Sequence, residues 1–206
     1  MEKEIYIIRH GETDLNAAGI VQGRGINSDL NDVGRAQAAA FYQRYKHPGF
    51  DKLYTSSLKR TRQTVKGFID DGLAWEQLSG LDELAWGIWE GKTATEHSRA
   101  VFRELAEQWQ SGNYYAKFSG GESPADVKAR LQEALDYILA KPDENKVLIC
   151  MHGRAMRLLC CMLTGKPLSE MADFPHLNTT LYRFRYADGK FEILDFNNTD
   201  HLKHLP

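Results

Sequence analysis

The chain of 206 residues is 42% hydrophobic and 26% charged, which suits a single soluble domain with a full core and a small cap. Its net charge of −2 excludes a global field that would recruit nucleic acid or a membrane, so a few local arginines must bind any anion. The three clustered cysteines exclude a disulfide framework and indicate a reducing compartment, the cytoplasm.

The first stretch of the chain is a short apolar run that ends abruptly in polar residues. Residues 5–8 predict a buried strand, and Arg9, His10 and Gly11 follow it directly. Ligands of open α/β sheets bind beyond the carboxyl ends of strands, and a glycine there lets backbone amides approach a ligand. Arg9 and His10 are therefore candidates for an anion site, although a histidine that merely caps a strand is the commoner arrangement. The strand starts too close to the N-terminus to leave room for a signal peptide.

A long loop follows the histidine. Residues 12–31 are polar and rich in glycine, and a loop of this length inside a compact domain is usually functional. Asn16, Gln22 and Arg24 could reach back from it to the strand end as donors. Apolar residues at helical spacing then predict a helix over residues 32–47.

A second short strand leads to another cation. The strand is expected at residues 51–55, and Ser56 and Ser57 are expected to cap a helix with Arg60 in its first turn. A guanidinium at the positive end of a helix is mildly unfavourable without an anion. With a phosphate present, the helix amides and the guanidinium would all point the same way.

The middle of the chain predicts a cap. Residues 84–91 are rich in aromatic residues and glycine, and helices are predicted over residues 93–111 and from residue 123 to 141. These two helices could cover the strand ends. We expect one domain over residues 1–206, with a cap insertion at roughly residues 85–122.

The strongest buried strand, residues 146–151, mirrors the first one because it also ends in His-Gly, here His152 and Gly153. Two such strands suggest two imidazoles that face each other across one pocket. Alternating runs at residues 180–186 and 190–196 flank an Asp-Gly turn and predict an antiparallel hairpin at the sheet edge. The pattern predicts an α/β three-layer sandwich: a central, mostly parallel sheet with helices on both faces and a small helical cap.

The polar groups expected at the strand ends suit phosphoryl transfer. Arg9, Arg60 and the imidazoles of His10 and His152 would bind a tetrahedral dianion through charge-assisted hydrogen bonds. Neighbouring cations should lower the pKa of His10 and keep it a free nucleophile near pH 7. Glu83 could protonate the leaving alcohol.

Several motifs in order resemble the histidine phosphatase superfamily, the clan of cofactor-dependent phosphoglycerate mutases and related acid-type phosphatases. They span most of the chain, and together they are far more specific than any one alone. The matching blocks are Arg9-His10-Gly11-Glu12-Thr13 with Asn16 and Gln22-Gly23, Gly34 with Gln37-Ala38, Ser57 to Thr61 with Thr64, Leu81-Asp82-Glu83 with Gly87 and Trp89-Glu90-Gly91, Gly121-Glu122-Ser123, and His152-Gly153.

This resemblance implies a role for each matching residue. His10 would be the nucleophile that forms a phosphohistidine, Glu83 the general acid, and Arg9, Arg60 and His152 the rest of the phosphate pocket. The resemblance implies no metal or other cofactor, and its partner would be a small phosphate ester. Further phosphate- or substrate-binding positions would be Asn16, Gln22, Gly23 and Gly153.

Three functions remain open at this point. The mutase branch usually has Glu-Arg-His-Tyr-Gly where residues 83–87 read Glu-Leu-Ala-Trp-Gly, which favours a phosphatase over a phosphoglycerate mutase. A catalytically silent phosphate-binding module is a third reading, disfavoured because a pure binder needs no leaving-group acid. Residues expected to form a partly apolar pocket mouth are Trp86, Trp89, Tyr114 and Tyr115, although the two tryptophans have nearly even odds of being core.

Other polar residues have more ordinary explanations. His201 and His204 could mimic a metal pair, but a solvated tail is the expected reading. Cys150 is expected to be an inert buried thiol rather than a partner of His152. Arginines expected at the surface by default are Arg24, Arg62 and Arg154, with Arg62 as the first candidate for an exception. Neither the substrate nor the oligomeric state can be read from this pattern.

Overall fold

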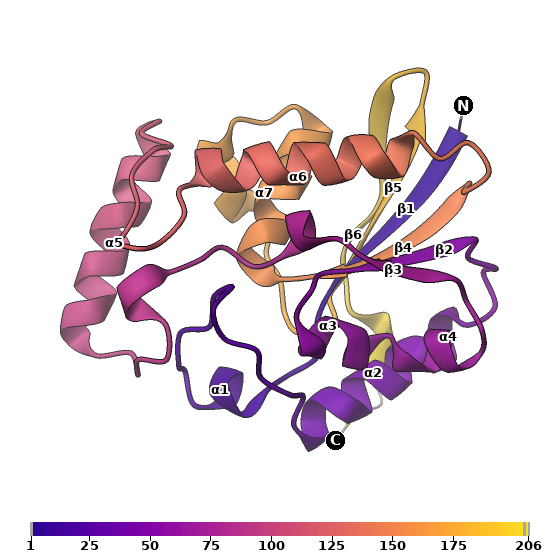
Figure 1. The fold of residues 1–206 in the computed structure, drawn as a ribbon, viewed down its shortest axis with the longest axis horizontal. Coiled ribbons are helices and arrows are strands. Elements are labelled where there is room, and N and C mark those ends of the chain that lie inside the picture. Colours follow the sequence, from indigo (N-terminus) through magenta and orange to yellow (C-terminus); the bar gives the residue numbers. More distant parts are fainter. Residues whose placement is uncertain (1, 204, 206) are drawn as a thin grey trace.

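A computed structural model of the chain describes residues 2–203 and 205 (Figure 1). Its centre is a six-stranded sheet with the order β3-β2-β4-β1-β5-β6. The strands are β1 (Glu2–Arg9), β2 (Lys52–Thr55), β3 (Trp75–Gln77), β4 (Lys146–Met151), β5 (Leu181–Ala187) and β6 (Lys190–Asn198).

The two strands that end in His-Gly are neighbours. β1 and β4 pair in parallel, with Arg9 opposite Met151, so His10 and His152 leave the sheet side by side. β2 pairs in parallel with β4 on its other side, and β3 with β2. The predicted hairpin is confirmed: β5 pairs antiparallel with β1, and β6 with β5. The sheet therefore brings both imidazoles to one edge.

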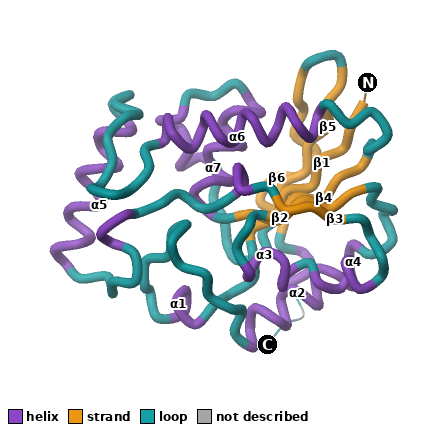
Figure 2. The backbone as a smooth tube through the Cα atoms, in the orientation of Figure 1, coloured by secondary structure: helices purple, strands orange, loops and turns teal. Residues whose placement is uncertain are grey.

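Helices cover both faces of the sheet, as predicted, and alternation along the strands feeds both layers (Figures 1 and 2). Ile5 and Ile7 point to the side of α6 and α7, whereas Tyr6 and Ile8 pack toward α2 and α4. The α-helices are α1 (Asp14–Ala17), α2 (Asp32–Tyr45), α3 (Lys59–Thr64), α4 (Lys66–Asp70), α5 (Glu96–Gln110), α6 (Pro124–Leu139) and α7 (Gly153–Thr164). The short 3-10 helices are η1 (Ser79–Leu81), η2 (Gly87–Trp89), η3 (Leu168–Asp173) and η4 (Asp200–Leu202).

The expectation that two helices form a cap is wrong for α6. Its apolar residues, such as Val127 and Leu131, are fully buried in the same core cluster as α7, so α6 belongs to a sheet-covering layer. Of the two helices predicted as a cap, α5 is the one that extends to one side of the sheet (Figure 1). At the N-terminus of α6, Ser123 and Asp126 form a reciprocal capping box, and a proline occupies the first position of the helix. Within the described residues, no helix is long and apolar enough to cross a membrane.

Gly11 was predicted to let backbone amides approach a ligand, and its own amide is not one of those available. Its N–H donates to Thr64 Oγ1 at 2.9 Å, so it is already paired within the protein. A Cβ on Gly11 would lie 2.6 Å from the carbonyl oxygen of Gly34, and a Cβ on Gly34 would lie 2.0 Å from that of Glu12. Both glycines are required because the start of α2 packs directly against the loop that carries His10.

Candidate active site

His10 lies at the end of β1 and is 3% exposed. Its Nδ1 is 2.7 Å from the carbonyl oxygen of Gly11. A carbonyl can only accept, so Nδ1 carries the proton and Nε2 keeps a free lone pair. Burial, followed by Arg60 and Arg9, holds the pKa of His10 well below 6.5. The predicted direction is confirmed, although burial rather than the cations is the main cause.

His152 lies opposite His10, with ring centroids 5.1 Å apart. Its Nε2 is 2.7 Å from Ser56 Oγ, which itself accepts the N–H of Leu58. The Ser56 hydroxyl also lies 3.0 Å from Thr61 Oγ1, and the Thr61 hydroxyl donates to the Leu58 carbonyl. The single hydroxyl proton of Ser56 therefore goes either to Thr61 or to His152. The other ring nitrogen of His152, Nδ1, is buried and has no protein partner.

Arg9 and Arg60 bring two cations close to His10. Arg60 is fully buried, and its Nη1 donates to the carbonyl oxygen of Ile26 at 2.6 Å. The Nε atoms of Arg9 and Arg60 are both buried without a hydrogen-bond partner. Unpaired buried donors of this kind are rare in folded proteins. Two of them beside His10 mark a place where an acceptor is missing.

The first amide of the helix that carries Arg60 is already occupied within the protein, contrary to the sequence-based expectation. Ser56 and Ser57 do not cap α3; Leu58 is the capping position and has no side-chain cap. Asn27 instead reaches over from the preceding loop and accepts the N–H of Lys59 at 2.7 Å. The side chain of Arg60, rather than the helix terminus, is therefore the group available to an anion.

Glu83 is held by the start of α7. Its Oε2 accepts the N–H of Arg154 at 3.1 Å, and its Oε1 accepts those of Ala155 at 3.0 Å and Leu84 at 2.9 Å. The positive end of the helix dipole favours a carboxylate there. Because α7 begins directly after His152, these hydrogen bonds place the carboxylate at the end of β4.

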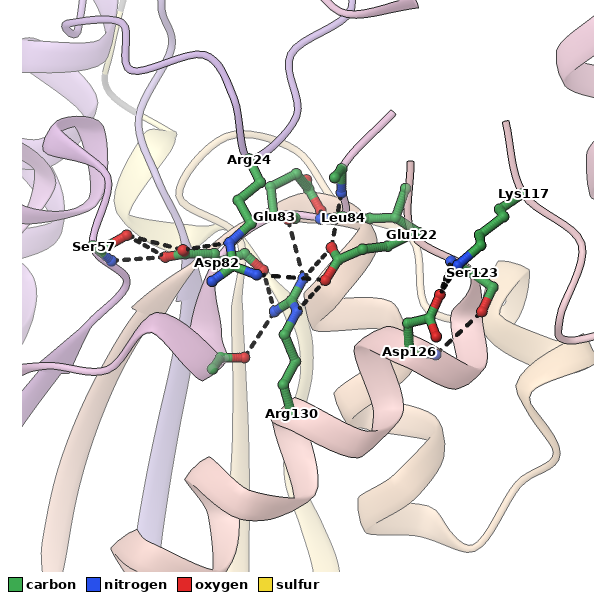
Figure 3. A network of polar contacts seen from close by, with 12 residues as sticks. Arg24, Ser57, Asp82, Glu83, Leu84, Lys117, Glu122, Ser123, Asp126 and Arg130 are labelled. Carbon is green, nitrogen blue, oxygen red and sulfur yellow. Dashed lines mark hydrogen bonds and ion pairs between the residues drawn. The ribbon is translucent and has the colours of Figure 1, made fainter. Parts of the chain in front are cut away.

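A network of arginines and carboxylates supports the segment that carries Glu83 (Figure 3). Arg130 of α6 donates Nε and Nη2 to the two carboxylate oxygens of Glu122, at 2.9 Å each. It also donates to the carbonyl oxygens of Gly80 and Asp82 at 2.8 Å and of Glu83 at 3.1 Å. Burial opposes the charge of Glu122, but the hydrogen bonds from Arg130 prevail and lower its pKa. Arg130, which the sequence did not single out, fixes the backbone on which Glu83 sits.

The network continues to α3. Arg24 Nε pairs with Asp82 Oδ2 at 3.0 Å, and its Nη1 lies 3.6 Å from Glu122 Oε1. Asp82 Oδ1 accepts the N–H and the hydroxyl of Ser57, at 2.8 Å each. Arg24 therefore links the loop to the acid segment, instead of standing free at the surface.

Asn16 and Gln22 lie near the strand end, but both are tied to Thr13. Asn16 Oδ1 accepts the N–H of Thr13 at 3.2 Å, and Gln22 Nε2 donates to the Thr13 hydroxyl at 2.7 Å. The carbonyl oxygen of Gly23 is 3.5 Å from Arg60 Nη2. Gly153 lies between Arg9 and a third imidazole, since a Cβ there would be 3.3 Å from Arg9 Nε.

That third imidazole, His176, was missed by sequence reasoning. Its Nδ1 lies 3.3 Å from Arg9 Nη1 and must accept, because a guanidinium only donates. Burial, together with Arg9 and two further arginines, lowers its pKa to about 3. It lies in an irregular loop between η3 and β5, where no strand-end pattern could have indicated it.

The backbone around His10 is also held by a strained residue. Thr179 has a φ of +57°, which is unusual for a β-branched side chain and costs about 1–3 kcal/mol. Its N–H donates to the carbonyl oxygen of Arg9 at 3.1 Å, and Asn178 Nδ2 donates to that of His10 at 3.0 Å. Thr179 Oγ1 in turn contacts His201 Nε2 at 3.0 Å.

His201 therefore does not belong to a solvated tail, as was expected. It is 7% exposed, and its ring packs edge-on against Phe41 of α2. His204, the other half of the metal-pair idea, lies outside the described residues. Cys150 is buried as predicted, and burial raises the pKa of its thiol.

The aromatic residues do not line a common pocket mouth. Trp86 packs with Phe102, Trp109 and Phe118, and Trp89 joins the same cluster. The cluster fastens α5 to the segment after Glu83. Tyr114 and Tyr115 instead border a separate cleft of about 680 Å³ beside α6 and α7.

A family model described as the histidine phosphatase superfamily, branch 1, matches residues 5–199. The chain belongs to the histidine phosphatase superfamily. As a member, it is an enzyme of the phosphatase or mutase type, with the α/β fold of its structural neighbours.

Known members of the superfamily match over nearly the whole chain. A probable phosphoglycerate mutase, GpmB of Yersinia pestis, is 32% identical over 90% of this chain and 86% of its own. The structure of Bacillus stearothermophilus YhfR has a TM-score of 0.85 at 27% identity, covering 98% of this chain and 100% of that one. A mutant phosphoserine phosphatase of Entamoeba histolytica, in complex with phosphoserine, has a TM-score of 0.82 at 26% identity, covering 97% and 99%.

Proposed function

We propose that the protein is a metal-independent phosphomonoester hydrolase that acts on a small phosphorylated metabolite through a phosphohistidine at His10. The observation that carries the proposal is the set of buried polar atoms without a partner beside His10: Arg9 Nε, Arg60 Nε and His152 Nδ1. A phosphate dianion offers acceptor oxygens to both guanidinium groups, and to His152 when Nδ1 carries the proton, through charge-assisted hydrogen bonds.

In the first step, His10 Nε2 attacks phosphorus. The N–P bond forms while the ester P–O bond breaks, and Glu83 in its acid form gives its proton to the leaving oxygen. Arg9 and Arg60 balance the charge on the equatorial oxygens, which is the main catalytic task in phosphoryl transfer. The hydrogen bond from His10 Nδ1 to the Gly11 carbonyl keeps Nε2 directed at the phosphorus.

In the second step, water attacks the phosphohistidine. The Glu83 carboxylate takes a proton from the water, the N–P bond breaks, and inorganic phosphate leaves with the enzyme restored. The lowered pKa of His10 supports this scheme because the imidazole of the free enzyme stays neutral, and so nucleophilic, throughout the physiological range.

The test is a phosphate-release screen in the presence of a chelator. The panel includes phosphoserine and phosphoglycerates, and His10→Ala is the control. We expect turnover without metal and a phosphoenzyme that is labile in acid and stable in alkali. A strict magnesium requirement or an acid-stable phosphoenzyme would contradict the proposal.

A phosphoglycerate mutase is the second candidate, because the Yersinia relative bears that description. Conversion of 3-phosphoglycerate after priming with 2,3-bisphosphoglycerate, without net release of phosphate, would decide for it. Binding of phosphate esters with no turnover across the panel would instead favour a silent binding module.

A further inference from the structure

Two arginines of α7, Arg154 and Arg157, lie one turn apart without an acidic partner. The guanidinium carbon of Arg154 is 5.6 Å from the ring centres of Trp86 and of Trp109. Its Nη1 contacts Met171 Sδ at 3.5 Å. Arg157 Nε is buried and has no hydrogen-bond partner. Among the ion pairs of the described residues, none involves either side chain.

These two arginines adjoin the phosphate pocket on the side of Glu83. The backbone N–H of Arg154 is bound to the carboxylate of Glu83, the proposed acid at the leaving oxygen. On the pocket side, His176 accepts from Arg9 and packs against Gly153, where a Cβ would meet the imidazole at 2.6 Å. Positively charged side chains therefore extend from Arg9 to Arg154 and Arg157, on the side of Glu83 where the leaving group of a substrate would lie.

The two arginines of α7 have less negative charge around them than Arg9 and Arg60. Glu83 lies near all four guanidinium groups, but Glu12 also lies near Arg9, and Asp82 and Glu90 lie near Arg60. Among the described residues, Glu83 is the one carboxylate close to Arg154 and Arg157. When Glu83 carries a proton as the acid, these two guanidinium groups are left without a counter-charge.

We propose that Arg154 and Arg157 bind a second anionic group, a carboxylate or a second phosphate, on the leaving alcohol of the substrate. This inference rests on the proposed hydrolase function and narrows its substrate class to phosphate esters of acidic alcohols. Arginine suits this task because its planar fork pairs with both oxygens of a carboxylate or phosphate.

A purely structural role for Arg154 makes a different prediction. If its purpose were to stack on Trp86 and Trp109, replacing it would lower stability but would not alter the choice between substrates. The decisive readout is therefore a ratio of two kcat/KM values. The matched pair is 3-phosphoglycerate and glycerol 3-phosphate, which differ only in a carboxylate replaced by a CH2OH group. Propane-1,3-diol bisphosphate against its monophosphate tests a second phosphate in the same way.

For the wild type, we expect the acidic member of at least one pair to have the higher kcat/KM. Arg154→Gln and Arg157→Gln should each lower that ratio by about tenfold to a hundredfold, as for loss of a charge-assisted hydrogen bond. Arg154→Lys, which keeps the charge, should retain part of the preference. Arg62→Gln, an exposed arginine of α3, is the matched control and should not change the ratio. Thermal unfolding checks that each variant is folded.

The outcomes separate this inference from the proposed function. If the ratio of kcat/KM values for the acidic and neutral substrates is the same in the wild type and in both glutamine variants, the second anion site is overturned. The proposed hydrolase function would still stand, because the esters are turned over. If no ester is turned over, the four ligands are titrated by calorimetry instead. Tighter binding of an acidic ligand that is lost in both variants would support the site, and equal affinities would overturn it.

Discussion

On the phosphate side of the site, His10 and His152 follow two hydrogen-bonded parallel strands, whereas on the leaving-group side Glu83 follows a 3-10 turn. The strand ends fix the two imidazoles through the backbone ladder and its buried side chains. The segment of Glu83 has no strand beneath it. It is held by three N–H groups and by the side chain of Arg130, which comes from a distant helix.

This difference has a consequence for how each side tolerates change. A substitution in the strand-end groups removes chemistry but leaves the sheet in place. A substitution in the arginine network leaves the chemical groups in place but frees the backbone that positions them. Four substitutions test this contrast, and their expected effects decrease from the first to the last.

Replacing His10 with alanine should have the largest effect. Without the nucleophile, kcat should fall by about 10⁴-fold or more, and no phosphoenzyme should form. The measurements are phosphate release and trapping of labelled enzyme. Because His10 is held at a strand end, we expect the melting temperature to change little by comparison. Residual phosphoenzyme in this variant would rule out His10 as the acceptor.

Glu83→Gln should act on the leaving-group step alone. We expect kcat for an alkyl phosphate to fall by about 10² to 10⁴-fold, the usual contribution of a general acid. With 4-nitrophenyl phosphate, whose leaving group needs no proton, the loss should be much smaller. Equal losses with both substrates would mean that Glu83 has another role.

Arg130→Met should weaken the leaving-group side without touching the reacting atoms. It leaves Glu122 without its main partner and three backbone carbonyls without donors, so we expect about 3 kcal/mol of stability to be lost. Denaturant unfolding measures this loss. Arg103→Met on exposed α5 is the control, with a change of about 0.5 kcal/mol or less. Similar stability losses in the two variants would show that the Arg130 network does not hold the segment.

The smallest effect concerns the pH dependence of stability. Burial lowers the pKa of His201 to about 4, whereas the unfolded chain binds this proton near pH 6.5. At this residue the unfolded state therefore binds more protons between about pH 4 and pH 6.5. The contribution of His201 to stability falls as the pH falls through that range and is constant above it. His201→Gln should reduce this slope by about 1.4 kcal/mol per pH unit. An unchanged slope in unfolding curves at pH 5 and 6 would contradict this.

Backbone patterns in the sequence determined the strand-end half of the site. Short continuous apolar runs, each closed by His-Gly, predict two buried parallel strands that bring His10 and His152 together, because parallel neighbours end at one edge of a sheet. The Asp-Gly hairpin and the capping box of α6 are equally local, since each depends on a few adjacent residues.

Only the tertiary structure decided the rest. Arg130, His176 and the buried His201 reach their partners across 47, 167 and 22 residues of chain. No local period records such a contact, so an isolated histidine or arginine reads as solvated surface until the fold surrounds it. The positions of His10 and His152 could be anticipated because each follows a strand that is anchored in a backbone ladder. The surroundings of Glu83 and the unpaired arginines of α7 could not be anticipated, because they depend on contacts between side chains that are distant in the sequence.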